Sequence, residues 1–426
     1  MVTDVYVPHN RWDLLDVRAP VDPTISVVVA HYEQHAQLAR VLAALRAQTT
    51  PPAEVIVADD GSATAPVCPG TKVLTQPDRG FRAAAARNMG ARAARGEVLV
   101  FLDADTVPGP DFLAALTQRV ARCPDVLAVG RREHRDLSAL HPGADPSTAP
   151  ALPAPAWLVE GYRASGNLLH TDGRGFRYVI SAVLACRASL FTDLGGFDER
   201  FTGYGGEDWD LAYRAWNSGA VLVHESDALA WHDGPSWEGR TNPDDLDAQT
   251  ARLAALIPEP GTRGAPLPAS VPDVLVDLAP GADVIRTVHS LLRQDFRDLR
   301  VCLPHHADDQ TRALYAGTAD GTAWSPDQRR RARAHLLVNS PLPPGALTRA
   351  MRTLVDDDLA RVVITAGGAP GAVLSSTRAT GRVRRWAGLM PADQVRSSFG
   401  TGALDVGSGP APRDTLDGFF HNGWGG

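Results

Sequence analysis

The sequence predicts an α/β protein whose first domain is built on a mostly parallel sheet. Short β-branched runs alternate with stretches in which apolar residues recur at helical spacing: residues 25–30 (ISVVVA) are followed by Leu38, Val41, Leu42 and Leu45. Residues 98–102 (VLVFL) form a continuous apolar run, which is typical of a strand buried on both faces. With 426 residues, 44% of them hydrophobic and 21% charged, the chain can hold more than one such domain.

Charge and hydropathy narrow the classes of partner. The formal net charge of -7, with no block of Lys and Arg, argues against nucleic acid and against an anionic membrane surface. A membrane span needs about 18 consecutive apolar residues, and the chain has no such stretch. Residues 1–23 lack the apolar segment of a signal peptide, so we expect a cytoplasmic protein without a membrane span.

Acidic residues follow two of the predicted strands. Residues 55–58 form a strand that ends at Asp59-Asp60-Gly61-Ser62, and the run 98–102 leads into Asp103-Ala104-Asp105. Residues 73–74 suggest a strand between them, and residues 78–94 an alanine-rich helix that carries Arg87. Ligands bind at the carboxyl ends of strands in open α/β sheets, and paired carboxylates suit a divalent cation that holds a diphosphate.

The segment after Asp103-Ala104-Asp105, the predicted metal motif, begins with a further helix and continues into a long loop. Pro108-Gly109-Pro110 opens the helix, whose Leu113, Leu116 and Val120 share one face. Residues 131–178 are rich in proline and predict a functional lid. Its aromatic residues either stack on a substrate or only pin the loop, and both alternatives stay open for Trp157, Tyr162 and Phe176. The mixed-charge run 131–135 is interpreted as a solvated face.

A second group of polar residues lies further along the chain. Gly203, Gly205 and Gly206 permit a tight turn before Glu207-Asp208, and His232 follows Trp231. In this order, the motifs from residue 25 to residue 232 resemble the family 2 glycosyltransferases, which are nucleotide-sugar-dependent enzymes of the GT-A fold. We therefore expect a GT-A (Rossmann-like) catalytic domain.

The resemblance implies roles for individual residues. Asp105 and His232 would hold Mn²⁺ or Mg²⁺, Asp208 would be the catalytic base, and Glu207 would orient the acceptor. One base and one in-line displacement imply inversion at the anomeric carbon. The guanidinium of Arg87 can hold phosphate oxygens, and Asp60 can accept hydrogen bonds from base and ribose. The full set of expected contacts with the nucleotide sugar is Ala30, Tyr32, Glu33, Asp60, Arg87, Asp103 and Ala104.

The expected activity is metal-dependent transfer of a sugar from a nucleoside-diphosphate donor, with UDP-hexose or UDP-N-acetylhexosamine as the expected donors. The acceptor would be soluble: a peptide side chain, a natural-product intermediate or a glycan. One alternative is a polysaccharide-chain synthase. A different class of alternative is a scaffold that binds sugar or peptide without turnover.

The second half of the chain repeats part of the pattern of the first. Residues 271–294 overlay residues 25–48 without a gap, which aligns Gln294 with Gln48. The acids are missing, because His305-His306 align with Asp59-Asp60 and Val338-Asn339-Ser340 with the metal motif. A metal cluster of Cys302 with His305-His306 is less favoured than a surface turn, since no further ligand spacing supports it.

These observations divide the chain into five parts. They are an N-terminal extension (1–24), the catalytic domain (25–240), a helix and Pro/Gly-rich linker (241–270), a degenerate GT-A-like α/β domain (271–396) and a glycine-rich tail (397–426). The degenerate domain would hold the acceptor or form the face of a homodimer.

Overall fold

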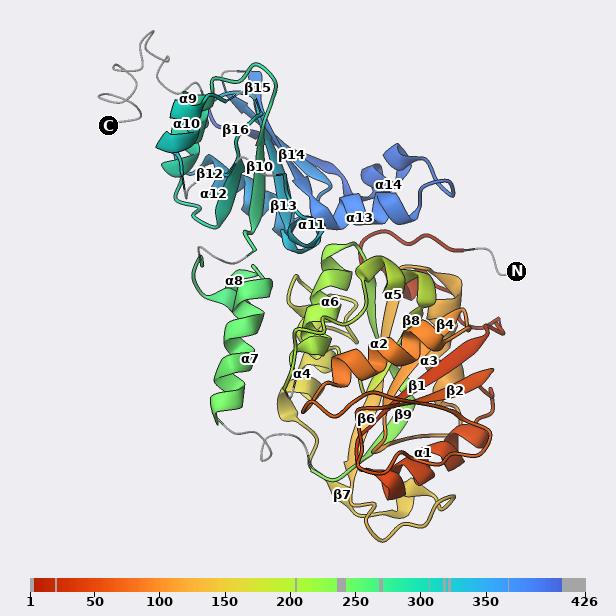
Figure 1. Ribbon diagram of the computed structural model, residues 1–426. Coiled ribbons are helices and arrows are strands. Elements are labelled where there is room, and N and C mark those ends of the chain that lie inside the picture. The colour runs from red at the N-terminus through yellow and green to blue at the C-terminus, as the bar shows by residue number, and fades with distance from the viewer. Residues whose placement is uncertain are drawn as a thin grey trace. The chain divides into compact units, whose positions relative to one another are not determined.

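A computed structural model describes residues 4–19, 21–203, 205–235, 243–267, 271–305, 307–316, 319–320, 323–366 and 368–407 (Figure 1). His306 and the aromatic residues of the tail, Phe419, Phe420 and Trp424, lie outside the described residues. The chain divides into two compact units. Unit 1 comprises residues 1–216 and 220–252, and unit 2 comprises residues 217–219 and 253–426.

Unit 1 contains a nine-stranded sheet in which eight strands follow the order β3-β2-β1-β4-β8-β6-β9-β5 and β7 pairs with β6. β1 to β4 are mutually parallel neighbours, β8 runs antiparallel to both β4 and β6, and β6 is parallel to β9. The strands are β1 (Ile25–His31), β2 (Glu54–Asp59), β3 (Lys72–Thr75), β4 (Val98–Asp103), β5 (Thr106–Pro108), β6 (Val126–Arg135), β7 (Ala151–Leu152), β8 (Val183–Arg187) and β9 (Val221–Asp233).

Helices cover this sheet (Figure 1). They are α1 (His35–Arg46), α2 (Ala83–Ala93), α3 (Phe112–Arg122), α4 (Ala156–Ala164), α5 (Ala188–Leu194) and α6 (Glu207–Asn217), with short 3-10 turns at Trp12–Leu14, Pro146–Thr148 and Gly175–Tyr178. A further helix, α7 (Pro243–Leu256), contains the boundary between the two units in the sequence. The strands predicted at residues 25–30, 55–58, 73–74 and 98–102 are confirmed, as are the helices carrying Leu38 to Leu45, Arg87 and Leu113 to Val120.

The central strand β4 explains why the sequence folds this way. Every residue from Val98 to Leu102 is at most 2% exposed. Burying one such apolar side chain stabilises the fold by roughly 1.5–3 kcal/mol. The strand therefore stays in the sheet up to Leu102, and the polar Asp103 falls at its carboxyl end, where β1 and β2 also end.

Two of the three aromatic residues of the long loop pin it to the core. The ring of Tyr162 stacks on His224 with 3.6 Å between centroids, and its hydroxyl donates to the carbonyl of Tyr178 at 2.5 Å. Phe176 is fully buried against Tyr213. Trp157 differs from both because it is only half-buried. Of the three, only Trp157 keeps surface on which a substrate could stack.

Unit 2 is also α/β and contains a seven-stranded sheet in the order β12-β11-β10-β13-β15-β14-β16. Its strands are β10 (Val274–Leu278), β11 (Leu299–Cys302), β12 (Ala319–Asp320), β13 (Ala334–Val338), β14 (Arg361–Ala366), β15 (Ala369–Ser376) and β16 (Thr401–Asp405). Its helices are α8 (Pro260–Arg263), α9 (Val284–Leu292), α10 (Asp309–Leu314), α11 (Pro326–Arg331), α12 (Ala346–Asp356), α13 (Thr377–Arg385) and α14 (Ala392–Phe399). β16 lies beyond residue 396, in the segment that we assigned to the tail from the sequence.

The two sheets share one topology. Reading along the sheet of unit 2, three parallel pairings are followed by two antiparallel pairings around β15 and one parallel pairing. The sheet of unit 1 has the same succession from β3 to β9, with β8 in the position of β15. The order of these seven strands along the chain also corresponds.

A buried glutamine makes the same pair of backbone hydrogen bonds in each unit. Gln48 donates to the carbonyl of Gly109 at 2.6 Å and accepts from the amide of Leu113 at 3.0 Å. Gln294 donates to the carbonyl of Pro343 at 2.9 Å and accepts from the amide of Leu347 at 3.2 Å. The sequence alignment of Gln48 with Gln294 therefore corresponds to an equivalence in three dimensions.

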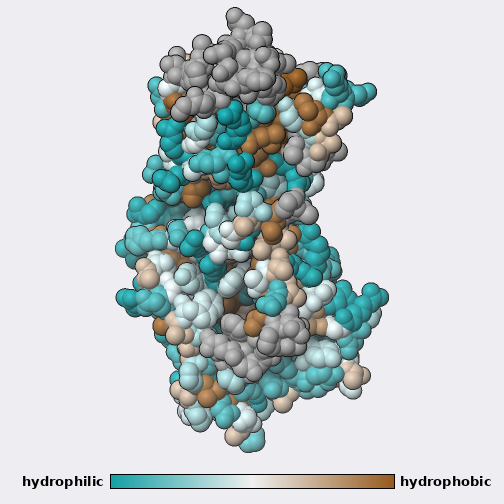
Figure 2. All heavy atoms as spheres, turned by 90° about the vertical axis from the view of Figure 1, so that its left-hand side faces the viewer, coloured by the Kyte–Doolittle hydropathy of each residue, from teal (hydrophilic) through white to brown (hydrophobic). Residues whose placement is uncertain are grey.

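Within the described ranges, every helix is too short or too polar to cross a lipid bilayer. The face of the molecule in Figure 2 is largely hydrophilic, with hydrophobic residues gathered in small groups.

Candidate active site

The site lies in unit 1, where β1, β4 and β9 bring polar side chains together. β1 and β4 are paired so that Ala30 lies beside Asp103, and the amide of Ala104 donates to the carbonyl of Ala30 at 2.9 Å. β5 pairs with β9 so that Thr106 lies opposite His232, and the amide of Asp233 donates to the carbonyl of Asp105 at 2.8 Å. These backbone contacts bring Asp105 and His232 together although 127 positions separate them.

His232 and Asp105, the predicted metal ligands, lie side by side. Nε2 of His232 lies 3.6 Å from Oδ2 of Asp105, while Nδ1 lies 3.2 Å from the carbonyl of Gly234. A carbonyl can only accept, so Nδ1 carries the proton in the neutral ring and the lone pair of Nε2 is directed toward Asp105. Burial lowers the pKa of His232, which favours this neutral form although the charge of Asp105 opposes the shift.

The carboxylate of Asp105 and the imidazole of His232 together suit a hard or borderline divalent cation that takes its remaining ligands from the substrate. Among the described residues, no group of three or more His, Cys, Asp or Glu side chains is placed to hold a metal ion. A pair consisting of one carboxylate and one imidazole suits an ion that completes its coordination with diphosphate oxygens and water. Gln34 lies beside the pair, with its amide donating to Oδ2 of Asp105 at 3.0 Å.

Arg87 is the buried centre of an ion-pair network. Its Nη2 donates to Asp103 at 2.7 Å and its Nη1 donates to Glu207 at 2.9 Å. Burial alone would lower the pKa of Arg87, but the charges of Asp103 and Glu207 outweigh it and raise the pKa above its ordinary value. Arg87 therefore fixes the metal motif relative to α6, and both of its terminal nitrogens are engaged by protein carboxylates.

Glu207 and Asp208 are the first two residues of α6. Gly205 and Gly206 both have φ of +90°, and a Cβ on Gly206 would lie 2.8 Å from the ring of Phe201, so the turn before α6 requires glycine here. Burial raises the pKa of Asp208 to about 7, the charge of Glu207 adds to the rise, and Arg87 and Arg132 oppose it. Oε2 of Glu207 is buried without a hydrogen-bond partner among the described residues.

The first acid turn is held by its own side chains. Asp59 accepts hydrogen bonds from Ser62 at 2.6 Å and lies 2.8 Å from Nδ1 of His31, so it is a positioning residue. Asp60 accepts from Gln76 at 2.5 Å and from the amide of Arg82 at 2.6 Å. Each oxygen of Asp60 thus already has one protein partner, which leaves one lone pair on each for a ligand.

The other residues expected at the nucleotide differ in exposure. Tyr32 is 48% exposed and its hydroxyl lies 3.4 Å from Asp78. Glu33 accepts from the amide of Ala63 at 2.6 Å and its own amide donates to Ser62 at 2.9 Å. Their contact with a nucleotide stays a prediction.

Arg132 was not among the residues expected at the site, because residues 131–135 were interpreted as a solvated face. β6 pairs with β9 so that Arg132 lies beside Ala230 and His134 beside His232. The rings of His134 and His232 are 4.8 Å apart. Side chains alternate along a strand, so Arg132 shares the face of His134, which is the face of the site. The alternation within residues 131–135 could have suggested this, but only with the strand pairing known.

An aromatic cluster includes the residue that follows the predicted base. The amide of Trp209 donates to Oδ1 of Asp208 at 2.8 Å. The indole of Trp157 meets that of Trp209 edge to face at 6.3 Å and stacks on Tyr178 at 6.2 Å. All three rings are half-buried. They form one aromatic cluster, which we call the aromatic wall, and it includes Trp209, the residue that follows Asp208.

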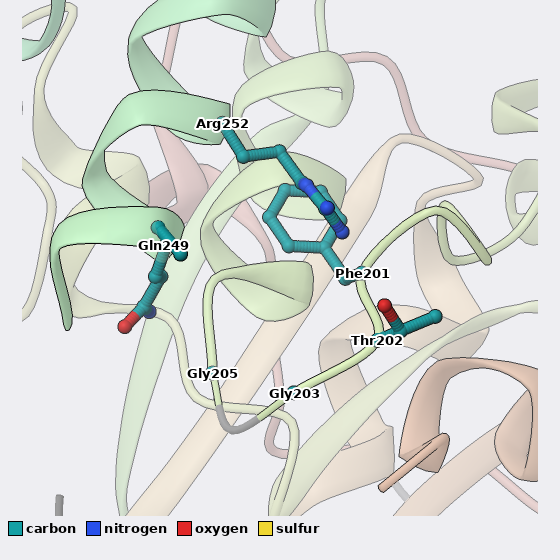
Figure 3. Close-up of a pocket in the computed structure, with 7 residues that line it drawn as sticks. Phe201, Thr202, Gly203, Gly205, Gln249 and Arg252 are labelled. Atoms are coloured by element: carbon teal, nitrogen blue, oxygen red, sulfur yellow. The ribbon is translucent and has the colours of Figure 1, made fainter. Parts of the chain in front are cut away.

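A small hollow of about 60 Å³ lies beside the turn that precedes α6 (Figure 3). The guanidinium of Arg252 covers the ring of Phe201, 5.7 Å from its centroid. The lining residues, which include no carboxylate, are Phe201, Thr202, Gly203, Gly205, Ala248, Gln249 and Arg252. The hollow is therefore not the site at Asp105 and Asp208.

Two protein-family models match parts of unit 1. Residues 26–171 match the model of glycosyl transferase family 2, and residues 173–224 match that of the N-terminal domain of galactosyltransferase. Unit 1 therefore carries the similarity to family 2 of the glycosyltransferases, over about a third of the chain. The parallel strands β3-β2-β1-β4, in which β2 and β4 end in an aspartate, confirm the predicted α/β class, and the sheet of unit 2 confirms the second α/β domain.

The chain matches about half or less of the length of its curated relatives. The chain is 34% identical over 215 residues to a validoxylamine A glucosyltransferase of Streptomyces hygroscopicus subsp. limoneus. The matched region covers 45% of this chain and 48% of the relative. It is 29% identical over 252 residues to a hyaluronan synthase of Pasteurella multocida. Here the matched region covers 53% of this chain and 26% of the relative. A crystal structure of GalNAc-T7 with UDP, GalNAc and Mn²⁺ is similar with a TM-score of 0.40 and 18% identity, over 57% of this chain and 52% of that chain.

Proposed function

We propose that unit 1 transfers a sugar, with inversion, from a nucleoside-diphosphate sugar to a hydroxyl of a soluble acceptor. One observation carries the proposal: Arg87 ties the metal motif to α6, so that the Asp105–His232 pair and the Glu207–Asp208 pair belong to one site in a family 2 domain. UDP is our expected nucleotide.

Asp208 is the proposed base. The hydroxyl proton of the acceptor moves to the carboxylate of Asp208 as the acceptor oxygen bonds to the anomeric carbon. The bond from that carbon to the diphosphate oxygen breaks, and its electron pair stays on the leaving diphosphate. A base is most effective when its pKa lies near the working pH, and the pKa of Asp208 is raised to about 7.

Asp105 and His232 are the proposed ligands of Mn²⁺ or Mg²⁺, which when bound would neutralise charge on the diphosphate. Asp103 supports this arrangement through Arg87. Arg87 holds Glu207 through Oε1. We assign Oε2 of Glu207 to a hydrogen bond that is donated by a hydroxyl of the acceptor substrate.

The aromatic wall beside Asp208 supports an acceptor that contains a ring. Trp157 and Trp209 offer partly exposed apolar faces next to the carboxylate that must meet the acceptor hydroxyl. Sugars and cyclitols pack their C–H faces on such rings. A natural-product intermediate or a glycan fits this wall better than an aliphatic peptide side chain.

A polysaccharide-chain synthase is the second candidate, and the match to a hyaluronan synthase favours it. Unit 2 argues against two active sites in one chain. Its sheet repeats the strand order of unit 1, but Val338 ends β13 where Asp103 ends β4, and Asn339 and Ser340 follow it. We propose that unit 2 is a degenerate GT-A-like repeat that holds the acceptor or a second copy of the chain.

Turnover of a donor panel tests the proposal. The full chain is incubated with UDP-, GDP- and dTDP-sugars, Mn²⁺ and a set of sugar and cyclitol acceptors, and release of nucleoside diphosphate is followed. We expect acceptor-dependent release with one donor class in the wild type, and loss of that release in Asp208→Asn with donor binding retained. Equal turnover in both proteins would show that Asp208 is not the base. Donor binding without any turnover would favour the scaffold alternative.

A further inference from the structure

Arg132 places a positive charge at the proposed reaction centre. Its charge acts on Asp208 at the start of α6 and on His232 at the end of β9. The pairing of β6 with β9 puts it two residues before His134, whose ring contacts that of His232. The strand pairing therefore places Arg132 on the face of His232, and its charge also acts on Asp208.

Arg132 lacks the carboxylate partner that its neighbours have. Arg131 and Arg135 lie 3.7 Å and 3.4 Å from the carboxylate of Glu133. Among the residues that the structure describes, no hydrogen bond or ion pair reaches the side chain of Arg132, and its Nε is enclosed without a partner. A half-buried cation loses part of its hydration, so an anion that arrives with a ligand is bound favourably there.

Arg87, the arginine that the sequence analysis assigned to phosphate, is not available for this task. Both of its terminal nitrogens donate to carboxylates, and the side chain is 5% exposed. Holding phosphate through these nitrogens would require it to release Asp103 or Glu207 and leave a buried carboxylate without its partner. Arg132 can bind an anion without breaking any existing ion pair.

We propose that Arg132, rather than Arg87, holds the diphosphate of the donor sugar. The inference rests on the proposed function of this site. As the bond between the anomeric carbon and the diphosphate oxygen breaks, the electron pair adds negative charge to the phosphate, and the guanidinium stabilises this charge through donated hydrogen bonds. Arg132 gains or loses no proton in this step.

Calorimetric titration of the full chain tests the proposal. The probes are whichever of UDP, GDP, dTDP and CDP binds the wild type most tightly, and the matching nucleoside, which lacks the phosphates. We expect Arg132→Gln to weaken binding of the nucleoside diphosphate by about tenfold or more, because a hydrogen bond to a charged group is lost. Binding of the nucleoside should stay within about twofold, and Arg132→Lys should restore part of the loss.

Arg131→Gln is the matched control, because Arg131 is 47% exposed and paired with Glu133 on the same strand. It should bind both probes like the wild type. Unchanged binding of the diphosphate by Arg132→Gln would overturn the proposal, and so would equal loss for diphosphate and nucleoside. An effect confined to the KM of the acceptor would assign Arg132 to an anionic acceptor instead. If the wild type binds none of the four diphosphates, the proposed function itself fails, which is a different result.

Discussion

Arg87 donates to Glu207 at 2.9 Å across 120 positions of sequence, and its other terminal nitrogen donates to Asp103 at 2.7 Å. The side chains of Arg87 and Glu207 are 5% and 7% exposed. The contact joins α2 to the first residue of α6. It therefore couples the position of the proposed base to that of the metal motif.

The first prediction concerns the stability that this contact provides. Arg87→Gln leaves two carboxylates without their cation, and removing one partner of a buried pair typically costs about 3–5 kcal/mol. We expect a loss of that order in the free energy of unfolding, measured by urea denaturation. Arg92→Gln is the control, since Arg92 is 66% exposed and paired with Glu199 at 3.4 Å, and it should cost less than about 1 kcal/mol. Equal effects of the two substitutions would contradict the account.

The second prediction concerns the rate of transfer by Asp208→Asn. Loss of a general base typically lowers the rate by about 10²- to 10⁴-fold. We expect kcat to fall within this range while the affinity for the nucleoside diphosphate changes little. The exposed Asp227 of β9 offers a control, and Asp227→Asn should turn over like the wild type. A kcat for Asp208→Asn within a few-fold of wild type would exclude Asp208 as the base.

The third prediction is the pH dependence of the reaction. Burial raises the pKa of Asp208 to about 7, and only the ionised carboxylate accepts a proton. The rate should therefore rise tenfold per pH unit well below pH 7 and level off above it, with the acid limb of kcat/KM near pH 7 in the free enzyme. An acid limb near the ordinary aspartate pKa of about 4 would show that the carboxyl is not desolvated.

The fourth prediction concerns the metal pair. His232→Ala removes the Nε2 that faces Asp105 at 3.6 Å, so Mn²⁺ should no longer strengthen nucleotide binding. We expect the affinity of His232→Ala for the nucleoside diphosphate to be the same with Mn²⁺ and with a chelator, while that of the wild type falls on chelation. A variant that still responds to Mn²⁺ would show that the ion lies elsewhere.

The fifth prediction concerns the acceptor. Trp157→Ala removes the half-buried ring that meets Trp209 edge to face at 6.3 Å. An aromatic stacking contact contributes about 0.5–1.5 kcal/mol, so the KM of the acceptor should rise about twofold to tenfold with the donor KM unchanged. Val159→Ala, two residues along α4 at a side chain that is 55% exposed, is the control. A rise in the donor KM alone would place Trp157 at the nucleotide.

Local features of the chain could be predicted from the sequence because local physics determines them. The apolar run 98–102 has no stable position except the interior of a sheet, and the acids after it must then lie at the sheet's edge. The repeat in unit 2 was predictable for a similar reason. Gln48 accepts a hydrogen bond from the first turn of α3, and Gln294 accepts one from the first turn of α12.

Contacts between distant segments could not be predicted in this way. Nothing in residues 78–94 shows that the terminal nitrogens of Arg87 meet Asp103 and Glu207, so a free phosphate-binding arginine was the natural interpretation. Arg132 was missed for the complementary reason. Its neighbours Arg131 and Arg135 pair with Glu133, and only the pairing of β6 with β9 shows that Arg132 faces the other way, toward the site.

The central claim is that unit 1 binds a nucleoside diphosphate through a metal ion at Asp105 and His232. Calorimetric titration of UDP, GDP, dTDP and CDP into the full chain, with Mn²⁺ and then with a chelator, tests it most directly. The account predicts that one nucleotide binds clearly more tightly than the other three and that this preference is lost when the metal is removed. Absence of binding by all four nucleotides in the presence of Mn²⁺ would contradict it.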